Sequence, residues 1–391
     1  MYEFVKSKLD DKIVKMMNFS FAIEHLDEET LKRIIEKDIA EKYSELYLVK
    51  DGEKYVSSLQ LLDFEMKLRN SIVKMGGIGA VVTNAIYRGK GGVKFMLKKT
   101  LELMKEKDYA VSVLYPFSID FYRKYGWERF DDMITYTVSP LLFINSGKLN
   151  EYELYDAYEA DHELLEFYNS FSEKNYNLVQ KTEWLMKREL FCEFADSIDK
   201  KFIKFKKNYK ITGMMKLNFF SEKSGPKIIC DNFVYENPET IKAMFEFFTS
   251  LSLQISEIDI NLPKDFEIWP YLKDRPKNSS LRQRSMIRIV DILKLDGLRI
   301  NTSDMEFIVE VTDNFAEWND GIFKFRIKDG ILKVEKAEDA DIKCDISVLS
   351  TVLSGFTDFK TMHEMGKVEV KESKNLSFDL PKETTYLEIH F

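Results

Sequence analysis

A glycine-rich stretch, Arg88-Gly89-Lys90-Gly91-Gly92, has the residue types and spacing of a phosphate-binding turn. It follows the apolar run 78–82 and precedes residues 93–104, whose apolar positions have helical spacing. The N–H groups of such a turn point outward, and the helix N-terminus adds partial positive charge. Glycines let the backbone approach a phosphate, and Arg88 adds a cation. The stretch therefore predicts a strand, a phosphate-binding turn and a helix.

The spacing within this turn excludes two nucleotide-binding motifs. It lacks the terminal Lys-Ser/Thr of a P-loop, and its glycines do not fit the dinucleotide-binding pattern. A glycine-rich turn before a helix can also be a simple turn, so the residues that follow decide its meaning.

The next residues supply a second apolar strand and an aromatic segment. Residues 109–115 are apolar and end at Pro116, and Phe121-Tyr122-Arg-Lys-Tyr125-Gly126-Trp127-Glu128 follows. This order of turn, helix, strand and aromatic segment resembles the acetyl-CoA half of the GNAT N-acetyltransferases. The resemblance implies that the turn holds the CoA pyrophosphate and that Tyr122 lies near the thioester sulfur. Val93 departs from the family pattern R-x-x-G-x-G/A, because it stands at the second small position.

The resemblance also implies acetyl-CoA as co-substrate and a set of residues that bind it. These residues are Val81, Val82, Thr83, Arg88, Gly89, Lys90, Gly91, Gly92 and Ser118. No metal is expected, because the 3 cysteines and 4 histidines are scattered and form no C-x-x-C or His-x-x-x-His pair.

Acetyl transfer to an amine requires a base for the amine, a hydrogen-bond donor for the thioester oxygen and a proton for the thiolate. A phenol with a pKa near 10 is mostly protonated at neutral pH, so Tyr122 is the expected general acid. The alternative is a buried tyrosine that only packs a core. Tyr125 and Trp127 are expected to be packing residues.

The expected base is the α-carboxylate of Phe391. The sequence ends Tyr386-Leu-Glu-Ile-His-Phe391, on an aromatic residue with no polar tail. Burial of that ring would carry the carboxylate into a pocket, where desolvation raises the pKa of a carboxyl group. The alternative is a last strand that simply stops there.

Acidic and aromatic residues near the N-terminus are the expected substrate contacts. Glu24 and Asp27 could attract a cationic amine, and Phe19 and Phe21 precede them. Such acids are also common as solvated surface or N-cap groups.

Composition favours a fully folded protein. Of the 391 residues, 45% are hydrophobic and 14% aromatic, which argues against disorder. The net charge of -8 makes general nucleic-acid binding improbable and suits a cationic substrate. No apolar run is long enough to span a bilayer and no signal peptide is evident, so a cytoplasmic protein is expected.

The first part of the chain is expected to be an α/β domain over residues 1–148. A helix is predicted over 28–44, and the next strands over 46–49 and 55–64 are joined at Asp51-Gly52. A further strand is predicted over 72–82.

The second part, residues 149–283, repeats the strand–turn–helix–strand order without the glycines. Helices are predicted over 152–168 and 184–194, and a helix that starts at Asn237-Pro238-Glu239 precedes a strand over 255–262. It resembles a degenerate GNAT-like domain that cannot hold a pyrophosphate. The alternative is an unrelated α/β domain. Residues 274–280 are a linker candidate.

The third part, residues 284–391, has a different pattern. Strands are predicted over 286–289 and 305–311, then a hairpin around Asp329-Gly330, helices over 345–356 and 358–365, and a last strand over 367–370. This layout resembles an α+β sterol-carrier-protein-like domain.

The whole chain resembles the enhanced-intracellular-survival (Eis) family. That implies an α/β (α+β) fold of tandem GNAT-like domains, with mixed central sheets flanked by helices, and a C-terminal sterol-carrier-like domain. It also implies N-acetyl transfer to an aminoglycoside- or polyamine-like amine, with the terminal carboxylate, here that of Phe391, as general base, and a homo-hexamer. Two other functions stay open: a protein-lysine acetyltransferase, and a non-catalytic lipid-binding or scaffold protein.

Overall fold

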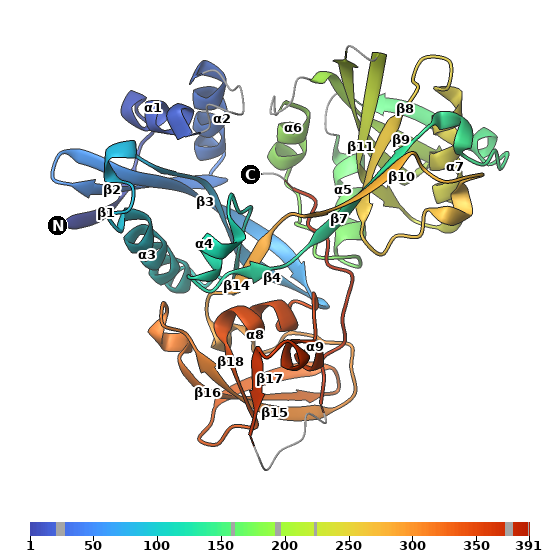
Figure 1. The fold of residues 1–391 in the computed structure, drawn as a ribbon. Helices are drawn as coiled ribbons and strands as arrows, with labels where there is room; N and C mark the ends of the chain where they lie inside the picture. The colour runs from blue at the N-terminus through green and yellow to red at the C-terminus, as the bar shows by residue number, and fades with distance from the viewer. Residues whose placement is uncertain (21–27, 158–160, 192–196, 223–224, 372–377, 390) are drawn as a thin grey trace. The chain divides into compact units, whose positions relative to one another are not determined.

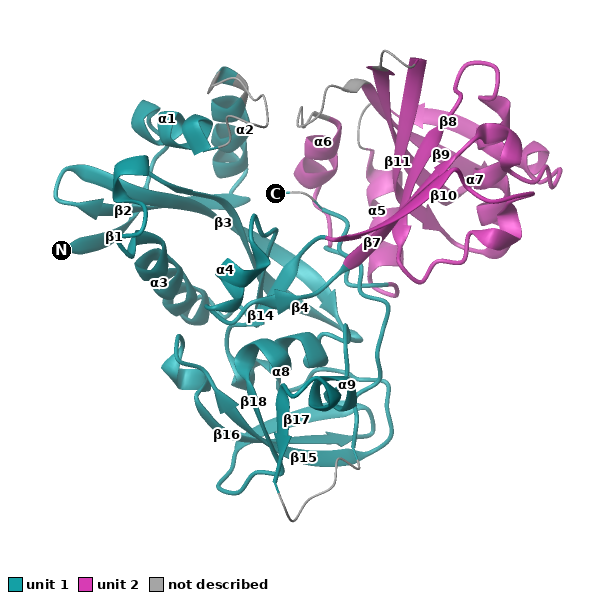
Figure 2. Cartoon of the chain, in the orientation of Figure 1, with its two compact units in different colours: residues 1–131, 176–179, 284–391 teal, residues 132–175, 180–283 magenta. Residues whose placement is uncertain are grey.

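The computed structural model describes residues 1–391 except 21–27, 158–160, 192–196, 223–224, 372–377 and 390. Over these residues the fold is mixed α/β with three sheets. The chain forms two compact units (Figure 2). One holds residues 1–131, 176–179 and 284–391, and the other holds 132–175 and 180–283. The expected α/β class is confirmed.

The first unit contains a seven-stranded sheet in the order β1-β2-β3-β4-β5-β14-β6. The strands are β1 (Tyr2–Ser7), β2 (Ser44–Asp51), β3 (Lys54–Leu68), β4 (Ser71–Thr83), β5 (Val111–Leu114), β6 (Glu128–Arg129) and β14 (Met286–Ile289). Strands β1 to β4 are antiparallel neighbours, whereas β4 and β5 are parallel. A parallel pair needs a crossover, which α3 (Gly92–Glu106) supplies.

Helices cover both faces of this sheet (Figure 1). Alternate residues of β2 show this, because Leu46 and Leu48 pack with α1 (Asp11–Ser20) and α2 (Glu28–Ala40), whereas Tyr47 and Val49 pack with α3. Successive strand side chains point to opposite faces, so the two helical layers lie on opposite sides. The short helix α4 (Ile119–Arg123) follows β5.

The third sheet also belongs to the first unit and has the order β17-β16-β15-β18-β19. Its elements are β15 (Met305–Thr312), β16 (Gly321–Lys328), β17 (Ile331–Lys336), β18 (Ile342–Asp345), α8 (Ile346–Leu353), α9 (Phe359–Glu364) and β19 (Val368–Val370). The predicted hairpin is present, with Asp329 and Gly330 both at positive φ. Phe307 stacks on Phe325 in the core beneath the helices.

The second unit has a sheet in the order β13-β7-β12-β11-β10-β9-β8. Its elements are β7 (Asp132–Val138), β8 (Glu153–Ala157), α5 (His162–Ser172), α6 (Glu183–Phe191), β9 (Ser197–Lys207), β10 (Lys210–Glu222), β11 (Gly225–Tyr235), α7 (Pro238–Ser250), β12 (Ile258–Pro263) and β13 (Asn278–Gln283). Four antiparallel strands, a helix and a parallel strand repeat the order of the first sheet. The expected second GNAT-like domain is therefore present as a fold.

The two seven-stranded sheets exchange one strand each. Strand β7 follows β6 in sequence but pairs with β12 and β13, whereas β14 follows β13 but pairs with β5 and β6. The exchanged strands occupy equivalent positions, each antiparallel to the strand after the crossover helix. Because β14 completes the first sheet, that sheet needs residues beyond 284.

Three predicted segments differ from the structure. The helix predicted over 152–168 is instead β8 followed by α5, because β8 pairs with β9 and the Asp161 side chain caps α5 by accepting from Leu164 N at 2.8 Å. Part of the linker predicted over 274–280 lies in β13, which pairs with β7. The helix predicted over 28–44 ends at Ala40, and strand β2 begins at Ser44.

Candidate active site

The paired part of strands β4 and β5 is short. It runs from Met75 opposite Val111 to Ile78 opposite Leu114 and ends there. Beyond that point β4 is bulged against β3, and Ala80 has a φ of +48°. Strand edges without a strand partner can hydrogen-bond an extended chain that carries amides. The last part of β4 is therefore suited to bind a pantetheine-like arm.

Val81, Val82 and Thr83 form this last part of β4. Val82 and Thr83 remain paired with β3 through Ser58 and Ser57. Val82 is buried in the core with α1, so only its backbone could contact a cofactor. Val81 packs against the core on the opposite face.

The glycine-rich turn has the geometry of an anion site. Gly89 and Gly91 have φ of +75° and +82°, a region that favours glycine. Gly91 is the N-cap of α3 and has no side chain that could accept hydrogen bonds from the first turn. The first N–H groups of the helix are therefore available to a ligand. A Cβ on Gly92 would lie 2.7 Å from Val56 Cγ1, which explains why the last residue of this turn is also a glycine. These residues fit a CoA pyrophosphate.

Cationic side chains flank the turn. Arg88 and Lys90 are exposed, and the Arg88 guanidinium lies 5.9 Å from the centre of the Phe19 ring. The carbonyl of Lys90 accepts a hydrogen bond from Tyr2 Oη at 2.9 Å, which fixes the turn against β1. Both cations can reach an anion in solvent.

Tyr122 lies on α4, directly after β5. Ser118 caps this helix and accepts a hydrogen bond from Phe121 N at 3.3 Å. The Tyr122 ring is 2% exposed and contacts Phe117, Phe121 and Trp127 edge to face. Burial raises the pKa of Tyr122, so the phenol stays protonated at neutral pH.

The residues after Tyr122 pack in the protein core. Trp127 is fully buried, and Tyr125 contacts Phe315 with ring centroids 5.0 Å apart. A Cβ on Gly126, which has a φ of +86°, would overlap the guanidinium of Arg288. That arginine is buried and ion-paired with Asp313 at 2.5 Å, so the chain admits only glycine here.

Phe391 lies against strands β3 and β4. Its ring contacts Phe64 and Tyr115, with centroids 5.1 and 5.3 Å apart. A Cβ on Gly77 would come within 3.0 Å of this ring, and a Cβ on Gly79 within 3.5 Å of the carboxyl carbon of Phe391. Gly76 faces Met104 on α3, so Gly77 and Gly79 face the opposite side of the sheet. The carboxyl group is thus beside β4, next to the last β4–β5 pair.

Sequence reasoning missed the residues that hold the last segment in place. Tyr115 Oη donates a hydrogen bond to Ile389 O, and the buried carboxylate of Asp131 accepts from Leu387 N at 3.2 Å. Burial raises the pKa of Asp131. These contacts span more than 250 residues, so no local pattern predicts them. Gly77 and Gly79 carried a signal, because glycines inside a strand mark a close approach of other atoms.

The expected substrate residues are only partly described. Phe19 lies at the end of α1 and is 64% exposed. Phe21, Glu24 and Asp27 lie outside the described residues.

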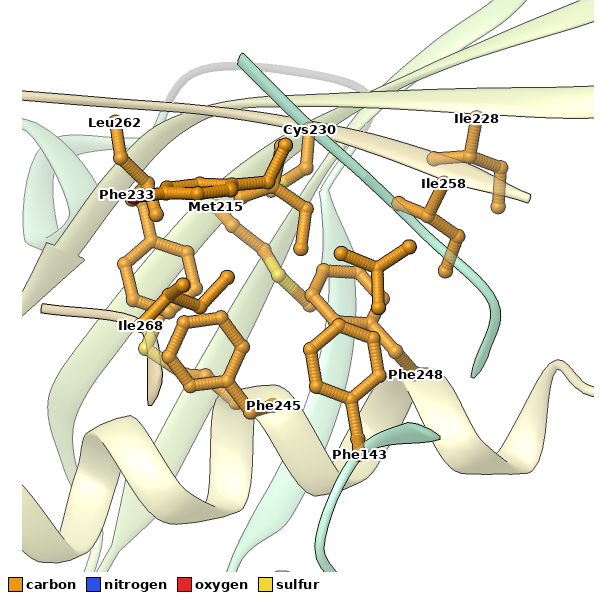
Figure 3. Close-up of a cluster of buried hydrophobic side chains, with 14 of the residues drawn as sticks. Phe143, Met215, Ile228, Cys230, Phe233, Phe245, Phe248, Ile258, Leu262 and Ile268 are labelled. Carbon is orange, nitrogen blue, oxygen red and sulfur yellow. The ribbon is translucent and has the colours of Figure 1, made fainter. Parts of the chain in front are cut away.

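Among the described residues of the second unit, the start of α7 has no equivalent glycine-rich turn. At the start of α7, the Asn237 side chain accepts from Thr240 N at 3.0 Å, and Pro238 offers no N–H. Where β11 and β12 diverge, the Phe233 ring lies against that of Phe245 (Figure 3), with 4.9 Å between the ring centroids. Phe233 also contacts Phe266. The position that corresponds to the glycine-rich turn of the first unit is therefore capped here, and the space where β11 and β12 diverge is filled by aromatic core.

Within the described residues, no group of three or more His, Cys, Asp or Glu side chains could hold a metal ion. In the same part of the chain, no helix is long and apolar enough to cross a membrane.

Comparison with protein families gives two matches. Residues 2–130 match the acetyltransferase (GNAT) domain, and residues 292–387 match a sterol carrier protein domain. Among curated proteins, no sequence matches the chain.

Solved structures share the whole fold at low identity. A GCN5-related N-acetyltransferase from Anabaena variabilis is 18% identical with a TM-score of 0.88, and both chains are covered completely. A probable N-acyltransferase from Enterococcus faecalis is 19% identical, with a TM-score of 0.82 and complete coverage of both chains. Eis1 from Mycobacterium abscessus is 15% identical with a TM-score of 0.76 over 95% of this chain and 94% of that one.

The chain therefore carries a GNAT acetyltransferase domain and a C-terminal sterol carrier protein domain in an Eis-like fold. The expectation of a GNAT-type N-acetyltransferase is confirmed at this level.

Proposed function

We propose that this acetyltransferase uses acetyl-CoA to acetylate an amine of a cationic small molecule, aminoglycoside- or polyamine-like. The observation that carries the proposal is the place of the Phe391 carboxyl group. It lies beside Gly79 in the same unit as an uncapped, glycine-rich helix start and a buried, protonated tyrosine. The carboxylate can serve as the base and the tyrosine as the acid that amine acetylation requires, and the helix start can bind the anionic part of the co-substrate.

Acetyl-CoA, when bound, supplies the activated acetyl group as a thioester. The N–H groups after Gly91 and the side chain of Arg88 would hold its pyrophosphate, and the edge of Val81–Thr83 that faces away from β3 would hold its amide-bearing arm. Gly89, Lys90, Gly92 and Ser118 complete the expected cofactor set as turn or cap residues.

The carboxylate of Phe391 accepts a proton from the acceptor amine as the amine nitrogen attacks the thioester carbonyl. Tyr122 donates its proton to the departing sulfur as the carbon–sulfur bond breaks. The proton gained by the carboxylate and the one lost by the phenol balance, and solvent exchange restores both groups.

The acceptor is proposed from charge. The protein carries a net charge of -8, which raises the local concentration of cationic amines. Glu24 and Asp27, with Phe19 and Phe21 nearby, are the proposed contacts for such an amine. A protein-lysine acetyltransferase would use the same chemistry on a peptide. A lipid-binding or scaffold role gives no reason to keep both the open turn and Tyr122.

A thiol-release assay with acetyl-CoA tests this function. Aminoglycosides, polyamines and lysine peptides are each supplied as acceptors, and the acetylated product is identified by mass spectrometry. Turnover with the small polyamines or aminoglycosides supports the proposal, whereas turnover with lysine peptides alone favours the protein substrate. Tight lipid binding without thiol release would favour the scaffold role. Light scattering after size exclusion tests the hexamer that the Eis resemblance implies.

A further inference from the structure

We propose that Arg69 is a positioning residue that fixes the last segment of the chain, and through it the carboxylate of Phe391. This inference rests on the proposed function, because it gives the carboxylate its role as base. Arg69 lies in the turn between β3 and β4, far along the hairpin from Gly79.

The conformation of Arg69 is unusual for its residue type. It has a φ of +53°, in the left-handed region that favours glycine, and its side chain is fully buried. A charged side chain is rarely buried so completely unless its donors are satisfied. A backbone outlier of this kind persists only where the surrounding contacts enforce it.

The guanidinium of Arg69 joins three parts of the chain. Nε donates to Leu353 O at 2.8 Å and Nη2 to Val352 O at 2.7 Å, which are carbonyls at the end of α8. Nη1 donates to Pro381 O at 2.6 Å and to Glu383 Oε1 at 3.2 Å, in the last segment. One planar group thus ties the β3–β4 turn, α8 and the last segment together, which the single ammonium of a lysine cannot reproduce.

The β3–β4 hairpin contacts the last segment of the chain at two places, at Phe391 and at its own turn. Phe64 on β3 and Gly79 on β4 contact Phe391, while Arg69 at the turn holds Pro381 and Glu383. Between these points, Glu383 N donates to Gly355 O at 2.8 Å and Asn177 N donates to Tyr386 O at 3.3 Å. The β3–β4 hairpin thus contacts the last segment at Arg69 and again at Phe391.

The same contacts give the sterol-carrier-like domain a role. All residues of α8 are buried, and the backbone carbonyls at its C-terminal end accept the Arg69 hydrogen bonds. The domain then serves as the support from which the last segment reaches the GNAT sheet. It needs no lipid ligand for this role.

A double-mutant cycle separates positioning from a structural effect. Arg69→Met is combined with a short glycine-serine extension after Phe391, and kcat, KM for acetyl-CoA and CoA affinity are measured for all four proteins. We expect Arg69→Met alone to lower kcat about ten- to a hundredfold with KM for acetyl-CoA unchanged, because a shift of ~1 Å in a positioned group can cost a hundredfold. In the extended protein, where the carboxylate is already displaced, Arg69→Met should have no further effect.

An equal loss of kcat in both backgrounds would show a general structural effect and overturn the proposal. Unchanged kcat in a folded Arg69→Met protein would also overturn it. Full activity of the extended protein with Arg69 intact would instead show that the carboxylate is not the base. A failure of the proposed function is thereby distinguished from a failure of the role proposed for Arg69.

Two variants keep the test valid if Arg69→Met does not fold. Arg69→Lys keeps the charge but not the fork, and Glu383→Gln removes only the ion pair to the last segment. Lys181→Met is the matched control, since it removes another fully buried cation, paired with Glu189 at 2.7 Å in the second unit. It should lower the melting temperature and leave kcat unchanged. If Lys181→Met lowers kcat as Arg69→Lys does, the proposal is wrong.

Discussion

The carboxyl carbon of Phe391 lies 3.5 Å from the position that a Cβ on Gly79 would occupy. Gly79 directly follows Ile78, the last residue of β4 that pairs with β5. The end of the chain and the divergence of the two strands are therefore adjacent.

Replacing Gly79 should affect turnover more than stability. A valine there places methyl groups against the carboxyl group and against Leu62 Cδ1, which is 3.0 Å from the Cβ position. We expect Gly79→Val to lower kcat about tenfold or more. Gly76→Ala is the matched control on the opposite face, where Met104 must move. It should cost about 1–3 kcal/mol of unfolding free energy and leave kcat intact. Equal kcat losses in both would contradict the prediction.

Tyr122→Phe removes the proton and keeps the ring among its aromatic neighbours. We expect turnover to fall about 10²–10⁴-fold while acetyl-CoA still binds. Because burial raises the pKa of Tyr122, loss of its proton should not limit the rate below about pH 10. Steady-state kinetics over pH 6–10 test both points. Wild-type turnover in this variant would leave Tyr122 as a packing residue.

The glycine turn should control cofactor affinity. Gly91→Val adds both backbone strain and a Cβ at the phosphate site, so KM for acetyl-CoA should rise. Gly297, with φ of +85° and no atom within 4 Å of its Cβ position, gives the control, because Gly297→Val adds similar strain far from the turn. Arg88→Ala should weaken binding by about 1.5–3 kcal/mol through loss of a charge-assisted contact. CoA affinity measured by calorimetry should stay normal only in the Gly297 variant.

Glu45 should make the first unit sensitive to acid. Burial alone would raise its pKa, but hydrogen bonds from Lys107, Lys6 and Tyr47 outweigh this and lower the pKa of Glu45 to about 2. The stabilisation is present above about pH 4.5 and is lost as pH falls toward 2. Because the group is partly exposed, we expect Glu45→Gln to cost only about 1 kcal/mol at pH 7. The difference from wild type in thermal melts should shrink toward pH 3; a constant difference would contradict this.

Local patterns allowed much of the fold and part of the site to be predicted. The turn at Arg88–Gly92 and the position of Tyr122 follow from strand, glycine and helix signals within a short stretch. The start of α7 was also predicted, since Asn237 and Pro238 are strong N-terminal signals.

Other features depend on contacts that sequence order hides. Strand β7 pairs with strands far later in the chain, and Arg69 binds carbonyls more than 280 residues away. The helix predicted over 152–168 failed because pairing with β9 overrides local helical spacing in β8. Long-range pairing and buried ion contacts have no local pattern, so only the structure reveals them.

Comparing tags at the two ends of the chain tests the role of the Phe391 carboxylate as base most directly. The N-terminal ammonium is exposed and pairs only with the surface residue Asp51 among the described contacts, so an N-terminal tag should leave the protein active. A few residues added after Phe391 replace its carboxylate with an amide beside Gly79. We predict that this protein folds and binds acetyl-CoA normally but loses nearly all thiol release. Full activity of the C-terminally extended enzyme would contradict the assignment of the Phe391 carboxylate as base.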